Sequence, residues 1–314
     1  MWHPFQVPPD QSVALVDGPW SHRDVSAGGL RFHVAEAGPP DGPLVLLLHG
    51  FPEFWWSWRH QLVAFGDAGY HAVAPDLRGY GASDKPPRGY DAYTLSADVA
   101  GLVRALGARE AHLVGHDWGG YLGWTTATLH PRTVRSLSAL SIPHPLRMWE
   151  GLRDRRQAQA SAYIAGFQLP RVPEARLRSG VLVGELLRRW GGPGFPDREA
   201  DERYRAAMAV PAAAHCALEY YRWAVRSQVR PEGRRFREVM TRGVEAPVLH
   251  LHGALDACIL TSTVVGSAAW ARGGYELRVL GGVGHFPHEE VPQTVTAALL
   301  AHIGADGGRL RARA

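Results

Sequence analysis

The chain has 314 residues, of which 46% are hydrophobic and 20% are charged, as in an ordinary soluble globular enzyme. The net charge is +4. Two short arginine clusters, at residues 153–156 and 234–237, contribute to it and are more typical of solvated helix faces than of a nucleic-acid site. The longest strongly apolar run, residues 44–48, is too short to span a bilayer, and residues 1–10 lack the apolar segment of a signal peptide. We therefore expect a cytoplasmic protein with no nucleic-acid partner and no membrane insertion.

The first half of the chain alternates short apolar segments with longer helical ones. The pattern predicts strands over residues 30–36, 44–48, 71–75, 111–114 and 134–142, and helices over 57–69, 95–106 and 121–129. Thr94 or Ser96 is the expected cap of the second helix. This alternation predicts an α/β fold with a mainly parallel twisted sheet flanked by helices.

The alternation stops after residue 142. Up to about residue 243 the chain is rich in Arg and Ala, is broken by Pro and Gly, and has no strand-like run. Strands are expected again over 247–251 and 275–280, followed by a helix over 292–303. We therefore expect a helical cap, residues 143–243, inserted between two parts of one core, residues 1–142 and 244–314.

The segment from Gly115 to Gly119 has the pattern of a nucleophile elbow, the sharp strand-to-helix turn that presents a reactive side chain. Its central residue is Asp117, where Ser is usual. A carboxylate is ionised at neutral pH without a base, and it can displace a leaving group from a tetrahedral carbon to form an ester. Epoxides and alkyl halides fit this chemistry, and water must then cleave the ester. A strand ending in a polar turn is the simpler alternative.

Ester cleavage needs a base and an orienting acid. His285 follows the strand predicted over 275–280 in a glycine-rich loop, where an open parallel sheet gathers its site, and is preferred to His288. Asp256 follows the strand predicted over 247–251 and is the expected partner of His285, although it could also cap a helix starting near Ile259. The order Asp117, Asp256, His285 is that of α/β-hydrolase triads.

The tetrahedral intermediate of ester cleavage needs hydrogen-bond donors for its oxyanion. In this arrangement they are the backbone N–H groups of the residue after the nucleophile and of a residue in an earlier strand–helix loop. These positions correspond to Trp118 and Phe51.

Three segments resemble α/β-hydrolase-fold epoxide hydrolases: 49–59 (HGFPEFWWSWR), 76–86 (DLRGYGASDKP), which dehalogenases of this fold share, and 115–120 (GHDWGG). The resemblance runs from about residue 30 to 303 and is weakest across the cap. Phe54 departs from the pattern, since a smaller residue is common there, and should reshape the pocket. The resemblance implies an α/β-hydrolase fold with an inserted helical cap.

Members of this family open the epoxide with two cap tyrosines that donate hydrogen bonds to its oxygen. The segments that resemble theirs hold Tyr163, four residues before Phe167, and Tyr221, with Tyr220 as the alternative if the register slips by one. A tyrosine hydroxyl keeps its proton at neutral pH, so it can donate to a developing alkoxide. Each tyrosine could instead simply pack the cap. The aromatic residues expected to line an apolar substrate pocket are Trp55, Phe51, Trp118 and Phe167.

The sequence thus predicts an epoxide hydrolase without cofactor or metal, acting on a small apolar epoxide. One alternative is a haloalkane or haloacid dehalogenase, in which the same triad attacks a carbon–halogen bond. Another is a ligand-binding protein without activity. Composition does not fix the oligomeric state, and a homodimer is among the forms that it allows.

Overall fold

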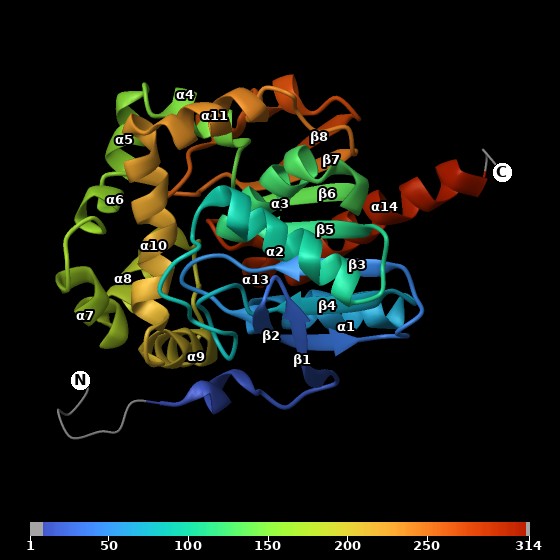
Figure 1. Ribbon diagram of the computed structural model, residues 1–314, viewed down its shortest axis with the longest axis horizontal. Helices are drawn as coiled ribbons and strands as arrows, with labels where there is room; N and C mark the ends of the chain where they lie inside the picture. Colours follow the sequence, from blue (N-terminus) through green and yellow to red (C-terminus); the bar gives the residue numbers. More distant parts are fainter. Residues whose placement is uncertain (1–8, 312–314) are drawn as a thin grey trace.

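The computed structural model describes residues 9–311, and within that range it holds one eight-stranded sheet in the order β1-β2-β4-β3-β5-β6-β7-β8 (Figure 1). The strands are β1 (Ser21–Ala27), β2 (Leu30–Ala37), β3 (Leu44–Leu48), β4 (His71–Pro75), β5 (Ala111–His116), β6 (Val134–Leu140), β7 (Val248–Gly253) and β8 (Tyr275–Leu280). The pairs β1–β2 and β2–β4 are antiparallel, and the other pairs are parallel. The predicted fold class is confirmed.

Helices cover both faces of the sheet. Helices α2 and α3 pack together on one face, and α1 and α14 pack together on the other (Figure 1). The helices outside the cap region are α1 (Arg59–Asp67), α2 (Ala92–Ala105), α3 (Trp118–Leu129), α12 (Thr261–Val264), α13 (Pro287–Glu290) and α14 (Pro292–Arg311). The 3-10 turns are η1 (Gln11–Ala14), η2 (Trp55–Trp58), η3 (Pro131–Thr133), η4 (Ser227–Val229) and η5 (Ser267–Trp270).

The central strands explain why this sheet forms. Every residue of β3, β4 and β5 is buried, as expected for strands covered on both faces, and β3 is an uninterrupted run of Leu and Val. Helix α2 begins earlier than predicted, because the Asp91 carboxylate accepts a hydrogen bond from the Thr94 N–H at 2.9 Å. Asp91, and neither Thr94 nor Ser96, is therefore its cap.

The chain between β6 and β7 is helical throughout its regular elements and forms a separate group beside the sheet (Figure 1). Its helices are α4 (Pro145–Gly151), α5 (Arg155–Ala160), α6 (Tyr163–Gly166), α7 (Val172–Arg178), α8 (Val181–Trp190), α9 (Arg198–Ala209), α10 (Ala213–Arg226) and α11 (Pro231–Met240). We call this group the cap. One connected cluster of buried apolar side chains extends from the sheet into it.

Among residues 9–311, no helix is both long and apolar enough to cross a membrane. Residues 1–8, which carry most of the expectation about a signal peptide, lie outside the described range.

Candidate active site

Asp117 stands on the sharp turn between β5 and α3. Its backbone has φ 47° and ψ −118°, a conformation that side-chain-bearing residues rarely adopt and that must be held by its surroundings. The turn is so tight that only glycine fits two residues before and after Asp117. A Cβ on Gly119 would lie 2.0 Å from the Leu48 carbonyl oxygen, and one on Gly115 would lie 2.3 Å from the Gly119 oxygen. The sequence therefore places the Asp117 carboxylate at the carboxyl end of β5.

Backbone donors surround this carboxylate. The N–H of Phe51, in the loop that follows β3, donates to Asp117 Oδ1 at 2.9 Å. Trp118 is the first residue of α3, and an N–H in the first turn of a helix has no acceptor within that helix. Both predicted oxyanion residues thus lie beside Asp117, and the contact from Phe51 is already made.

His285 joins Asp117 to Asp256. Its Nδ1 donates to Asp256 Oδ2 at 2.8 Å, while its Nε2 lies 3.7 Å from Asp117 Oδ2. The other oxygen of Asp256 accepts the N–H groups of Cys258 and Ile259 at 2.8 and 2.9 Å, which fixes the carboxylate in the turn after β7. Since α12 starts only at residue 261, Asp256 caps this turn rather than a helix.

His288, the rival base, faces elsewhere. It is fully buried, and its Nε2 lies 3.3 Å from Glu53 Oε1. Burial lowers the pKa of His288 to about 4, against a smaller raising effect of Glu53. Its ring packs against Trp58 and His116, away from Asp117 and Asp256, so the geometry favours His285.

Tyr163 and Tyr221 enter from the cap. Tyr221 belongs to α10, and its ring packs against Trp118 and Phe51 at centroid distances of 5.0 and 5.3 Å. Its buried hydroxyl makes no hydrogen bond with the described residues. Tyr163 begins α6, and its hydroxyl lies 3.4 Å from Cys258 Sγ. Tyr220 points away, because its hydroxyl donates to the Arg78 carbonyl at 2.8 Å.

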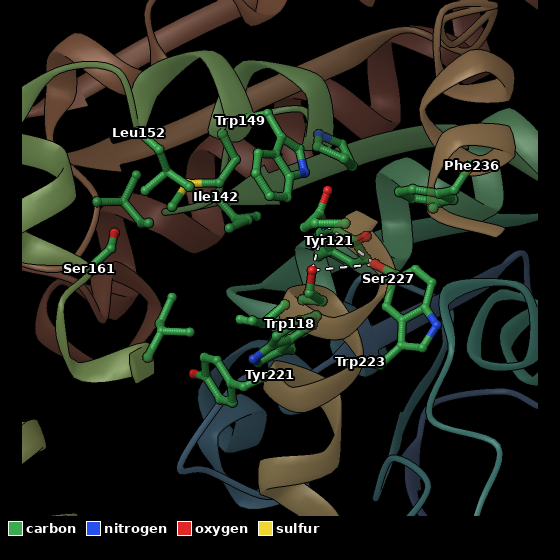
Figure 2. A pocket seen from close by; sticks show the side chains of 18 of the residues that line it. Trp118, Tyr121, Ile142, Trp149, Leu152, Ser161, Tyr221, Trp223, Ser227 and Phe236 are labelled. Carbon is green, nitrogen blue, oxygen red and sulfur yellow. Dashed lines mark hydrogen bonds between the residues drawn. The ribbon is translucent and has the colours of Figure 1, made fainter. Parts of the chain in front are cut away.

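A cavity of about 260 Å³ joins Asp117 to both cap tyrosines. Its walls are mainly apolar: in Figure 2, Tyr221 and Trp118 lie together on one side, and Trp149 and Leu152 lie on another. Phe167 lies outside this cavity, behind its wall, with its ring 5.0 Å from that of Tyr221 and 5.7 Å from that of Phe51.

The expectation for Trp55 requires correction, because this side chain does not line the cavity. Its indole N–H donates to the Ala14 carbonyl at 2.6 Å, and its ring packs against Trp20 and His22. The 3-10 turn η2 directs it toward the N-terminal segment, where it forms part of the core.

Known proteins with similar sequences support the same fold and identify the family. Residues 43–292 match the alpha/beta hydrolase fold family. Epoxide hydrolase A of Mycobacterium tuberculosis is 34% identical, over 89% of this chain and 96% of its own length. Epoxide hydrolase 3 of Xenopus tropicalis is 33% identical, over 94% of this chain and 80% of its own length.

The chain belongs to the α/β-hydrolase-fold epoxide hydrolases. Among solved structures, epoxide hydrolase A of Mycobacterium thermoresistibile superposes with a TM-score of 0.78 at 33% identity, covering 90% of this chain and 98% of that one. A mutant Bacillus megaterium epoxide hydrolase, complexed with its product, an (R)-naphthyloxy-propane-1,2-diol, has a TM-score of 0.78 at 27% identity, covering 90% and 100%.

In this epoxide hydrolase family member, burial and the neighbouring charges shift the pKa of His285 in opposite directions. Burial would lower the pKa of His285, but Asp256 and Asp117 together outweigh it and raise the pKa to about 10. The same contact holds the pKa of Asp117 below its ordinary value despite burial. At neutral pH the free site therefore pairs a His285 imidazolium with the Asp117 carboxylate.

Sequence reasoning missed the buried support of the His285 loop. The carboxylate of Glu53 lies 2.8 Å from His116 Nδ1, and His116 Nε2 hydrogen-bonds the His285 carbonyl at 2.8 Å. The sequence did contain a signal for this support: an acid inside the aromatic segment 49–59 is expected to be buried, and a buried carboxylate requires partners. No sequence pattern indicated that Cys258 would lie beside the Tyr163 hydroxyl.

Proposed function

We propose that this chain hydrolyses epoxides to vicinal diols through a covalent ester of Asp117. The observation that carries the proposal is the single apolar cavity that brings the Asp117 carboxylate together with the tyrosines at 163 and 221. A carboxylate and two neutral acids in one cavity match the two changes that ring opening needs, attack at carbon and protonation at oxygen.

In the first half of the reaction, an oxygen of Asp117 attacks one epoxide carbon while that carbon's bond to the ring oxygen breaks. The alkoxide that forms takes a proton from Tyr221 or Tyr163. Burial holds the pKa of both tyrosines well above the ordinary value, and the Asp117 charge raises it further, so both hydroxyls are protonated. The products are a hydroxyalkyl ester of Asp117 and one tyrosinate.

In the second half, His285 takes a proton from a water molecule, whose oxygen attacks the ester carbonyl. The oxyanion that results is stabilised by the N–H groups of Phe51 and Trp118. The intermediate collapses to the Asp117 carboxylate and the diol, and His285 keeps the proton from water, as in the free site. Asp256 orients the imidazole through the 2.8 Å hydrogen bond.

Ester formation also prepares the base. Esterification removes the negative charge of Asp117, which is one of the groups that raise the pKa of His285. The pKa of the imidazole therefore falls during the first half, so that the imidazolium of the free enzyme passes its proton to the tyrosinate and restores the tyrosine. The neutral imidazole is then the base that activates water.

The Asp117→Ala variant should reproduce this loss of charge. We expect the pKa of His285 to fall from about 10 toward or below its ordinary value of about 6.5. NMR titration of the nitrogen-15-labelled imidazole measures it directly. An unchanged pKa in Asp117→Ala would contradict the proposed coupling, and Tyr220→Phe, whose hydroxyl faces the core, is the control.

A single turnover in heavy-oxygen water tests the covalent route. Excess enzyme is mixed with styrene oxide, a long-chain epoxide or a bulky trans-disubstituted epoxide, and the diol and the protein are analysed by mass spectrometry. The bound diol of the Bacillus megaterium relative makes an aryl-bearing epoxide the first choice. We expect the label to enter Asp117, with unlabelled diol after one turnover. Label found only in the diol would refute the ester.

The dehalogenase alternative predicts a different outcome. A halide leaving group needs a cradle of donors and no proton, whereas the cavity presents two tyrosines that can supply one. Haloalkanes and haloacetates should therefore release no halide above the buffer rate. Halide release without diol formation from any epoxide would reverse the assignment.

A further inference from the structure

The loop that carries His285 meets the cap at one side chain, Glu290. This residue ends α13, and its Oε1 accepts the Phe286 N–H at 3.0 Å. Its Oε2 accepts the Gly284 N–H at 2.7 Å and the Gly192 N–H at 3.1 Å. Phe286 and Gly284 are the residues on either side of His285, and Gly192 follows the cap helix α8. One carboxylate therefore binds the loop at two points and the cap at a third.

The same two segments are joined at His285 itself. Its backbone N–H donates to the carbonyl of Trp190, the last residue of α8, at 2.9 Å. The segments touch through backbone atoms, because a Cβ on Gly284 would lie 2.3 Å from the Gly192 nitrogen, and one on Gly192 would lie 2.4 Å from Glu290 Oε2. A shift of the cap segment 190–192 would therefore move the backbone that carries His285.

The chemistry of this junction requires a carboxylate. Three N–H donors converge on two oxygens, and only an ionised acid accepts at both without presenting a hydrogen of its own. The adjacent Glu289 differs, since its side chain contacts Arg59 and Tyr204. Among the described residues, Glu290 has no such charged partner, and its hydrogen bonds go to backbone groups alone.

We propose that Glu290 is a positioning residue for ester hydrolysis, which holds His285 in place. Because Glu290 also binds the cap segment 190–192, the position of His285 depends on the contact between that segment and the His285 loop. This inference rests on the proposed function, in which His285 acts only in the second half of the reaction. Asp117 and the cap tyrosines perform the first half, and Glu290 contacts none of them. Loss of Glu290 should therefore slow hydrolysis of the ester and spare its formation.

The test uses Glu290→Ala and Glu290→Gln in the full chain, with Glu276→Gln as the control, because the exposed Glu276 side chain on β8 pairs with Arg278, away from the site. Each protein is mixed with excess styrene oxide and quenched in acid at successive times. Intact-protein mass spectrometry then measures the fraction of protein that carries the ester. In Glu290→Ala we expect ester formation within about threefold of the wild-type rate and ester hydrolysis slowed about tenfold or more, since a misplaced base is costly.

The rate of ester hydrolysis in the conservative variant should lie between those of Glu290→Ala and the wild type. In Glu290→Gln the amide oxygen can still accept two of the three N–H groups, so we expect a smaller defect that is again confined to hydrolysis. Wild-type behaviour is expected for Glu276→Gln. If Glu290→Ala does not fold, Glu290→Gln alone decides, because ester formation in the same sample reports a folded site.

Two results would overturn the inference: equal slowing of both halves in Glu290→Gln, or hydrolysis at the wild-type rate in both Glu290 variants. A parallel His285→Gln sample separates this failure from that of the proposed function. If His285→Gln accumulates ester while the Glu290 variants do not, only the positioning role falls. If no variant ever carries an ester, the covalent mechanism falls with it.

Discussion

The His285→Gln variant should form the Asp117 ester and then keep it, so that steady-state diol production falls by about 10³- to 10⁴-fold. The first half of the reaction needs no base, because Asp117 is ionised and the Phe51 N–H already contacts its carboxylate. The second half then lacks the imidazole that activates water, and His288 cannot replace it, since it is held against Glu53.

Intact-protein mass after a short incubation with styrene oxide should show a gain equal to one substrate, and peptide mapping should place it on Asp117. The matched control is Asp117→Ala, which should show neither the added mass nor turnover above buffer. An adduct on another residue, or a fully active His285→Gln, would refute the assigned roles of both side chains.

The sheet was the most predictable part of the molecule, and burial explains why. The five residues of β3 are all apolar and all buried, so the run 44–48 has the bounds of the observed strand. The edge strand β1 was missed, because its sequence, SHRDVSA, is largely polar and most of its residues are exposed. Pairing with β2 defines it, and that pairing is not encoded in its own pattern.

Chain order made much of the candidate site predictable. The residues at 117, 256 and 285 each follow a strand of one sheet, and parallel strands bring such positions to a common edge. Side-chain direction was less accessible. In the segment 49–59, Phe51 points its N–H at the nucleophile while Trp55 packs toward Ala14, and only the path of the turn decides between these directions.

Contacts between the cap and the core were the least predictable. Helical composition located the cap, but it does not say which helix face meets the sheet. In α10, adjacent tyrosines have opposite surroundings: the hydroxyl of Tyr220 reaches the Arg78 carbonyl, whereas Tyr221 lines the cavity. The hydrogen bond between Glu290 and Gly192 joins residues 98 positions apart, and no local sequence pattern predicts it.

The tyrosine pair should control the first half of the reaction. We expect Tyr221→Phe and Tyr163→Phe each to slow ester formation by about 10- to 100-fold, and the double variant by about 10³-fold or more, because a single remaining acid can still protonate the alkoxide. Phenylalanine keeps the ring that packs against Trp118 and Phe51, so the cavity wall should survive. Ester formation is followed by quenched mass measurement.

Tyr220→Phe supplies the matched control, since it removes a hydroxyl from the adjacent position of the same helix. It should lower stability by about 1 kcal/mol, the usual worth of a lost hydrogen bond, and leave ester formation unchanged. The defect in the Tyr221→Phe and Tyr163→Phe variants should be confined to ester formation, with hydrolysis of the ester, once formed, near the wild-type rate.

A double variant that still opens styrene oxide at the wild-type rate would show that the ring oxygen takes its proton from another group. A loss in Tyr220→Phe equal to that in Tyr221→Phe would instead attribute the effect to packing of α10, because only one of these two hydroxyls faces the nucleophile's cavity.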